Sequence, residues 1–131
     1  MLVLLGCLFL AGCGDARRQS VVGTVTVNGE PVESGHIEFR PQPGTSGPTA
    51  GSPIHGGEYE ITSGQGPFTG AFRVEIRAMR DSGRMIDDLA TGERVPALEQ
   101  FLPPEYNENS SLTAEVTAEQ QRYDFDLTLP Q

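Results

Sequence analysis

Two histidines and a few pairs of carboxylates are the side chains of this 131-residue chain that are best able to do chemistry. His36 and Glu38 are two positions apart and would share one face of a β-strand, and His55 is the other histidine. A zinc site generally takes three or four protein ligands in fixed geometry, and the sequence groups no such set. We therefore expect no metal and no cofactor, with His36 as an outward-facing polar residue.

Two acidic pairs could contact a cation. Asp124 and Asp126 alternate with apolar residues and should share a strand face, but calcium takes about six to eight oxygen ligands, so a solvated strand edge is favoured. Asp87 and Asp88 fall in a long predicted loop, which makes them the better candidates for a cation or a partner. The alternative for that pair is a solvated loop tip.

Nucleophilic catalysis would need a serine or cysteine beside a histidine and an orienting acid. Ser46 and Ser63 lie in glycine-rich stretches, but neither belongs to a Gly-x-Ser-x-Gly motif, and no phosphate-binding glycine motif is present. We therefore expect no enzymatic activity. The alternative is a periplasmic enzyme or metal-binding protein that uses His36, His55 and the Asp87–Asp88 pair.

The composition narrows the classes of partner. All nine basic residues are arginine, against 18 acidic residues, and the net charge of −9 argues against nucleic acid. Sugar binding by stacking needs exposed aromatic rings, and the chain has no tryptophan. Because Tyr59 and Tyr123 fall at inward positions of predicted strands, Tyr106 is the candidate platform for a glycan.

The elements that must position these side chains are predicted to be short strands. Apolar residues alternate with polar ones, and Asn28-Gly29 is a strong hairpin signal. This pattern indicates a prealbumin- or Ig-like antiparallel β-sandwich of about seven strands over residues 21–131. On the outer face of the strand at 71–79 we expect Arg73, Glu75 and Arg77 to form a charged contact surface. The predicted strands are 21–27, 31–40, 58–62, 71–79, 112–116 and 123–129.

Two long segments are predicted to be loops. Residues 41–53 are rich in Gly, Pro, Ser and Thr and are expected to be mobile. Residues 80–109 would join two strands, and loops of that length are usually functional or disordered, so we expect the main contact surface here. Within this segment, 96–101 is the best candidate for a short helix, and 101–107 should pack back onto the sandwich because it is apolar.

The N-terminus carries a targeting signal. Leu2–Leu10 is apolar or small throughout and too short for a membrane-spanning helix, which needs roughly twenty residues. Leu10-Ala11-Gly12-Cys13 resembles the bacterial lipobox, although no Lys or Arg precedes the apolar run. The resemblance implies a signal peptide at 1–12, a lipidated Cys13 and a tether over 13–20. The domain would then be anchored at the cell membrane or outer membrane, on the periplasmic or extracellular side.

The strands themselves carry a family resemblance. Gly23–Val32 and Gly35–Pro41, with Gly57–Ile61, Gly70–Ile76 and Pro103–Asn107, resemble carboxypeptidase regulatory-like (transthyretin- or prealbumin-like) domains and small lipoproteins of the planctomycete type. The resemblance implies a prealbumin-like sandwich at the cell envelope and implies no activity. The Lys–Asn isopeptide bond of collagen-adhesin B-type domains is excluded, since lysine is absent. The Tyr-Arg-Gly-Ser terminus of hydroxyisourate hydrolases is missing as well.

Together these features predict an extracytoplasmic lipoprotein. Its membrane anchor would be the lipid on Cys13, and its non-catalytic β-sandwich would bind or scaffold an envelope protein or glycan. A passive spacer is the remaining alternative, in which the surface of the sandwich contacts nothing.

Overall fold

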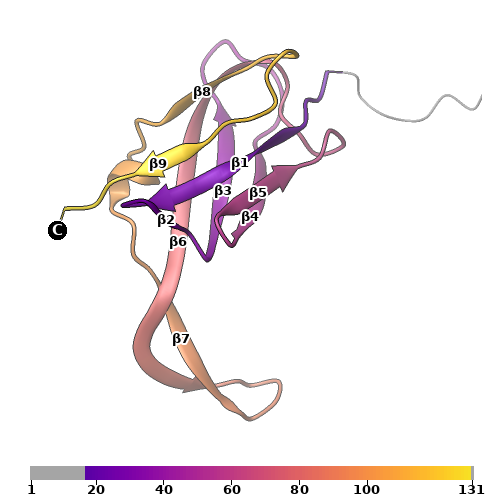
Figure 1. The fold of residues 1–131 in the computed structure, drawn as a ribbon. Coiled ribbons are helices and arrows are strands. Elements are labelled where there is room, and N and C mark those ends of the chain that lie inside the picture. The colour runs from indigo at the N-terminus through magenta and orange to yellow at the C-terminus, as the bar shows by residue number, and fades with distance from the viewer. Residues whose placement is uncertain (1–16, 131) are drawn as a thin grey trace, which may run out of the picture.

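The computed structural model describes residues 17–130, which form nine strands and one short 3₁₀ helix (Figure 1). The predicted signal peptide, Cys13 and the start of the tether lie outside the described residues. No helix between residues 17 and 130 is long and apolar enough to cross a membrane. The elements are β1 (Val21–Val27), β2 (Glu30–Pro31), β3 (Ser34–Pro41), β4 (Ala50–His55), β5 (Glu58–Ile61), β6 (Gly70–Asp87), β7 (Arg94–Gln100), η1 (Pro104–Tyr106), β8 (Thr113–Val116) and β9 (Phe125–Leu127).

The strands form two facing layers, so the all-β sandwich predicted from the sequence is confirmed (Figure 1). One layer holds β1 between β9 and β5, and the other holds β3 between β4 and β6, with β8 on the start of β6. The β4–β5 hairpin connects the layers through the pair His55–Glu58. All pairs of named strands are antiparallel except β1–β9, which is parallel.

The core lies between the layers, where the alternation of the strands predicts it. Phe39 of β3 is fully buried, and its ring centroid lies 6.2 to 6.4 Å from the centroids of four other aromatic rings. Rings at this spacing and at an angle add to the stabilisation that burial alone provides. Because two of these rings come from the segment around β9, Phe39 joins the two layers. The four rings belong to Tyr59, Phe72, Tyr123 and Phe125.

The Asn28-Gly29 turn is confirmed as a two-residue hairpin between β1 and β2. Both residues have positive φ, 50° and 83°, and the flanking pair is Val27–Glu30. Two consecutive positive φ values match the twist of a tight hairpin, and Asn and Gly adopt them at the lowest cost. The turn places Glu30 and Pro31 beside the end of β1, where a groove begins.

The prediction that 41–53 is a mobile loop is wrong for its second half. Ala50–His55 forms β4, and its residues pair with β3 from Ala50–Phe39 to His55–Ser34. The strand was hidden because Ser52 occupies an inward position while Gly51 and Pro53 are poor strand formers. Proline is tolerated there because β4 pairs with β5 only at its last residue, which leaves the edge of β4 at Pro53 without a partner strand.

The prediction of a loop over 80–109 is also wrong for most of its length. β6 continues to Asp87, and β7 folds back along it, so the two strands form an arm that projects from the sandwich (Figure 1). The suggested helix at 96–101 is instead the end of β7. The strands escaped prediction because neither face of the arm is buried, and because the register shifts between Asp81 and Met85.

The segment after β7 packs onto the sandwich as predicted for 101–107, and it covers an exposed strand edge. β6 pairs with β8 up to Arg73 and with β7 from Met79 onward, which leaves its middle open on that side. Asn107 Nδ2 donates to the carbonyl of Ile76 at 3.3 Å, and Ser110 donates to the carbonyl of Val74. Side chains thus complete the hydrogen bonds that no strand supplies.

Candidate binding site

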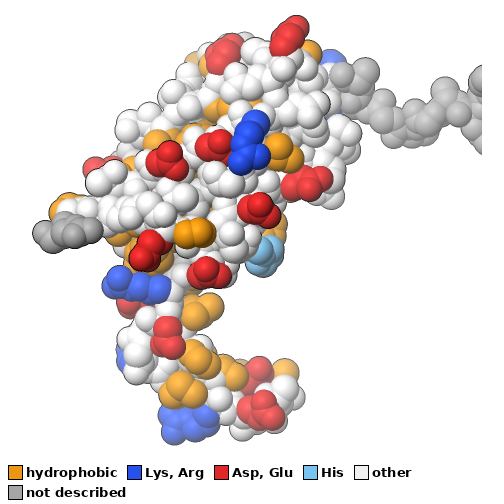
Figure 2. All heavy atoms as spheres, in the orientation of Figure 1, with side chains coloured by type: hydrophobic (Ala, Val, Ile, Leu, Met, Phe, Trp, Pro, Cys, Tyr) orange, Lys and Arg blue, Asp and Glu red, His pale blue; other side chains and the backbone are white. Residues whose placement is uncertain are grey.

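The arm carries large apolar side chains in contact with water. Leu89 at the turn is fully exposed, and Met85, Ile86 and Leu98 are 47%, 53% and 56% exposed. Apolar side chains on the arm are visible in the lower part of Figure 2. They occupy both faces, because Met85 lies opposite Pro96 on one face while Ile86 lies opposite Val95 on the other. Among residues 17–130, no further strand or helix covers either face of this two-stranded ribbon, and a ribbon of two strands is only marginally stable without such a layer.

The predicted acidic pair lies at the tip of this arm. Asp87 lies opposite Arg94 across the ribbon, with 3.8 Å between Oδ1 and Nε, and both side chains are exposed. Asp88 Oδ1 accepts a hydrogen bond from the backbone N–H of Ala90 at 2.8 Å, which shapes the turn. No group of three metal-binding side chains is found among residues 17–130. The pair therefore helps to form the tip of the arm.

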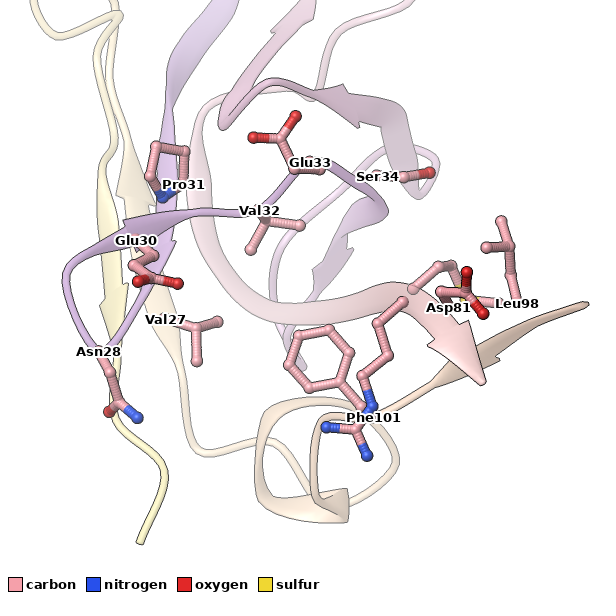
Figure 3. A pocket seen from close by; sticks show the side chains of 12 residues that line it. Val27, Asn28, Glu30, Pro31, Val32, Glu33, Ser34, Asp81, Leu98 and Phe101 are labelled. Atoms are coloured by element: carbon pink, nitrogen blue, oxygen red, sulfur yellow. The ribbon is translucent and has the colours of Figure 1, made fainter. Parts of the chain in front are cut away.

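A groove of about 600 Å³ opens where the arm leaves the sandwich (Figure 3). The turn after β1, the start of β3, the middle of β6 and the end of β7 all meet there. Its rim carries the carboxylates of Glu30, Glu33 and Asp81. Its apolar lining consists of Val27, Pro31, Val32, Met79, Leu98 and Phe101.

One arginine lines the groove, and it is held by neighbours. Arg80 lies over the ring of Phe101, with its guanidinium carbon 5.1 Å from the ring centroid, and its Nε contacts Glu99 Oε1 at 2.9 Å. Cation–π stacking and an ion pair together fix this side chain. The sequence could not indicate the groove, because its residues come from three segments far apart in the chain.

The predicted charged face at Arg73, Glu75 and Arg77 is held together by an ion-pair network. Glu75 is only 4% exposed, and it contacts Arg73 at 2.9 Å, Arg77 at 3.6 Å and Arg40 of β3. Arg40 also contacts Glu38 at 2.8 Å. The register of β3 against β6 puts Arg40 opposite Arg73, a position that the spacing within one strand could not indicate.

The histidines and the acidic pair of the enzyme alternative are not brought together. His36 lies opposite Arg77 on β6 and Pro53 on β4, and His55 ends β4 opposite Ser34. Both histidines belong to the sandwich, whereas Asp87 ends β6 at the tip of the arm (Figure 1). These residues therefore form no common site.

Asp124 and Asp126 join two strands instead of facing only water. Asp124 Oδ1 accepts from the Thr24 N–H at 2.8 Å and the Thr24 hydroxyl at 3.1 Å, and Asp126 Oδ1 accepts from Thr26 at 2.8 Å. Burial alone would raise the pKa of Asp124, but the hydrogen bonds from Thr24 and Arg122 lower it below its usual value. The two carboxylates thus hold the C-terminal segment against β1.

Tyr106 is not the open aromatic platform that the sequence suggested. It packs against the core, and its hydroxyl donates to the carbonyl of Thr128 at 2.7 Å and accepts from the N–H of Thr128 at 3.2 Å. The ring therefore secures the chain after β9. It presents only a half-buried surface to a ligand.

Comparison with known proteins assigns no family. No protein-family model matches the chain, and no curated protein matches it. A crystal structure of a 9R-lipoxygenase from Cyanothece is similar over 87% of this chain and 17% of its own, with 16% sequence identity and a TM-score of 0.34. This chain thus spans about a sixth of that protein's length, and a likeness this low carries no argument about fold or function.

Proposed function

We propose that this protein is a non-catalytic binding or scaffolding module, anchored by lipid on Cys13 at the extracytoplasmic face of a bacterial membrane, and that the β6–β7 arm contacts its partner. The observation that supports it is the exposure of Met85, Ile86, Leu89 and Leu98 on a ribbon that no other described element covers. Exposed apolar clusters of this kind commonly mark interaction surfaces. Docking would remove these side chains from water, and burial of apolar surface stabilises a complex by about 25 cal/mol per Å².

The direction of the arm supports the same proposal. The first described residues lie at the end of the sandwich away from the arm (Figure 1), where the Arg17 guanidinium stacks 4.6 Å from the centroid of Phe68. The backbone N–H of Gln19 donates to the carbonyl of Pro67 at 2.8 Å and fixes the path of the chain there. A lipid on Cys13, a few residues earlier, would leave the arm pointing away from the anchor.

The resemblance to carboxypeptidase regulatory-like domains supports the envelope assignment. It rests on turn glycines and strand positions such as Gly23 and Gly35, which build a sandwich and carry no chemistry. An enzyme is less well supported, because His36, His55 and the Asp87–Asp88 pair do not meet. An envelope protein is a better match to the arm than a glycan, since the exposed side chains are aliphatic and not aromatic.

Site-specific cross-linking in the bacterial host tests the proposal. A photo-reactive residue in place of Leu89 should capture a defined envelope component, whereas the same residue in place of the exposed Glu119 on the sandwich should not. Both positions are solvent-exposed, so the comparison controls for nonspecific capture. Equal capture from both positions, or none from Leu89, would contradict the arm as the contact element.

A further inference from the structure

The groove at the base of the arm combines an apolar lining with an acidic rim. We infer that it binds an extended polypeptide segment in which Lys or Arg alternates with large apolar residues. This inference rests on the proposed function, because it gives the chemistry of the partner that the arm would contact. Three independent features of the groove support it: its lining, its charge and the free strand edge beside it.

The lining favours large apolar side chains. Val27 and Val32 come from the sandwich, Leu98 from the arm and Phe101 from the segment after it, and all four line one concave surface (Figure 3). A volume of about 600 Å³ lies within the range of sites that bury a ligand. Leu98 is 56% exposed, so a partner's side chain seated here would bury apolar surface on both molecules.

The rim favours a cationic ligand. Glu30 and Glu33 make no ion pair among residues 17–130, and Asp81 only accepts the backbone N–H of Gly83 at 2.8 Å. Arg80, the one cation of the lining, is already paired with Glu99. The negative charges of these three carboxylates are therefore not neutralised by a basic side chain among residues 17–130. Lysine or arginine side chains of a ligand would complement them.

The free edge of β7 favours an extended ligand. The N–H of Asp88 bonds the carbonyl of Glu93, and the N–H of Phe101 bonds the carbonyl of Ala78, so the odd-numbered residues of β7 face β6. The even-numbered residues direct their backbone groups outward, and no described strand pairs with that edge. Pro96 has no N–H to offer, which leaves Leu98 and Gln100, beside the groove, as the place where an extended backbone can pair.

A second copy of this chain is a poorer occupant. The net charge of the chain is −9, and its arm, the most exposed apolar element, carries Asp87, Asp88 and Glu93 against Arg84 and Arg94 near its tip. Like charges would therefore meet at the rim. A basic partner gains the attraction that a second copy lacks.

Calorimetric titration of the full-length protein in uncharged detergent micelles tests the inference. The probe is an octapeptide of alternating Lys and Val with blocked termini. The heat of titrating the peptide into empty micelles is subtracted. We expect saturable binding that weakens as salt is raised. Peptides with Glu in place of Lys, or Ser in place of Val, should bind at least about tenfold more weakly, since each loses one of the two complementary features.

Matched variants separate the groove from general attraction to an acidic protein. The triple variant Glu30→Gln, Glu33→Gln, Asp81→Asn should weaken binding about tenfold, whereas Glu108→Gln, Glu115→Gln, Glu119→Gln, with the same change in net charge, should stay within about twofold. Leu98→Ser should also weaken binding, and Leu89→Ser at the tip should not. All eight substituted positions are solvent-exposed, so we expect every variant to fold.

The outcomes are distinct. Absence of binding, or equal weakening by both triple variants, would overturn the groove assignment. If the peptide fails while cross-linking at Leu89 still captures a partner, the inference falls and the proposed function stands. If the peptide binds at the groove and no partner is captured in cells, the arm loses its assigned role and the groove keeps its ligand class.

Discussion

At the scale of single residues, Gly23 illustrates how closely the layers meet. A Cβ added at this position would lie 1.9 Å from the carbonyl oxygen of Tyr123 and 2.9 Å from Tyr59 Cε1. The hydroxyl of Tyr59 donates to the same carbonyl, so three chain segments converge on one backbone group. Burial raises the pKa of Tyr59 well above its usual value, which keeps the donor protonated.

Gly23→Ala should therefore destabilise the fold. We expect a loss of about 1–3 kcal/mol or more, the range for overpacking, because the obstacle is backbone and cannot rotate away. Chemical denaturation measures the difference. Gly64→Ala is the matched control, since a Cβ there meets nothing within 4 Å, and an equal loss in both variants would contradict the predicted clash.

Asn107 is the residue whose structural role the sequence did not reveal. Its side-chain amide donates to the carbonyls of Ile76 and Pro103, and its Oδ1 accepts the backbone N–H of Glu108 at 3.0 Å. Asn107→Ala should cost about 1–3 kcal/mol, because the buried carbonyl of Ile76 loses its donor. The exposed Asn109→Ala should cost much less in the same denaturation experiment, and comparable losses would argue against the edge-covering role.

Because of Asp124, the free energy of unfolding should decrease in acid. Its pKa is lowered in the folded state, so its contribution is complete above the unfolded value of about 3.9 and is lost as the pH falls through the lower folded value. The stability difference between the native protein and Asp124→Asn should thus be largest near neutrality and shrink below about pH 4. Denaturation midpoints from pH 2 to 7 check this, and a difference that does not vary with pH would refute it.

At the scale of elements, prediction succeeded where one face of a strand is buried. In the first half of β6, apolar and charged residues alternate in the sequence, and the apolar Phe72, Val74 and Ile76 are buried. Asn28-Gly29 likewise adopts the positive φ angles that its type of turn requires. β4 and β7 escaped because hydrophobic alternation is the signal that locates a strand, and these two strands lack it. The arm, which is the proposed contact element, therefore could not be located from hydrophobic alternation.

The arm should be removable without loss of the fold. Arg80 and Glu99 lie opposite each other in the ribbon, and the odd-numbered residues of β7 direct their backbone groups toward β6, so a two-residue Asn-Gly turn can replace residues 81–98. We expect the free energy of unfolding to change by no more than about 1 kcal/mol, since no core residue lies in the deleted segment. Circular dichroism and denaturation measure this. Loss of the folded state would show that the arm supports the sandwich.

The same deletion separates a binding module from a passive spacer. A spacer should tolerate the shortened chain with its biological role intact, whereas a binding module should lose its partner while the sandwich remains folded. Measuring stability first makes the second result interpretable, because a folded protein that has lost its partner has lost a surface and not its structure.

At the scale of the whole molecule, the predicted attachment to the membrane depends on one side chain, the thiol of Cys13. Cys13→Ala should abolish incorporation of a labelled fatty acid, because the thiol is the predicted acceptor. Cys7→Ala should leave the label in place, since Cys7 lies within the apolar run that the peptidase would remove. Labelling of the Cys13 variant, or loss of label in the Cys7 variant, would contradict the lipobox assignment.

The amino-acid sequence by itself determined the class of fold, the inward faces of the main strands and the tight turn after β1. These features depend on residues within a few positions of one another, through side-chain alternation and backbone φ preference. The tertiary structure alone decided that Glu75 is buried among three arginines, that Asn107 covers the edge of β6, and that Glu30, Asp81 and Leu98 share a groove. Strand register and layer packing join residues far apart in the chain, and local patterns do not encode that pairing.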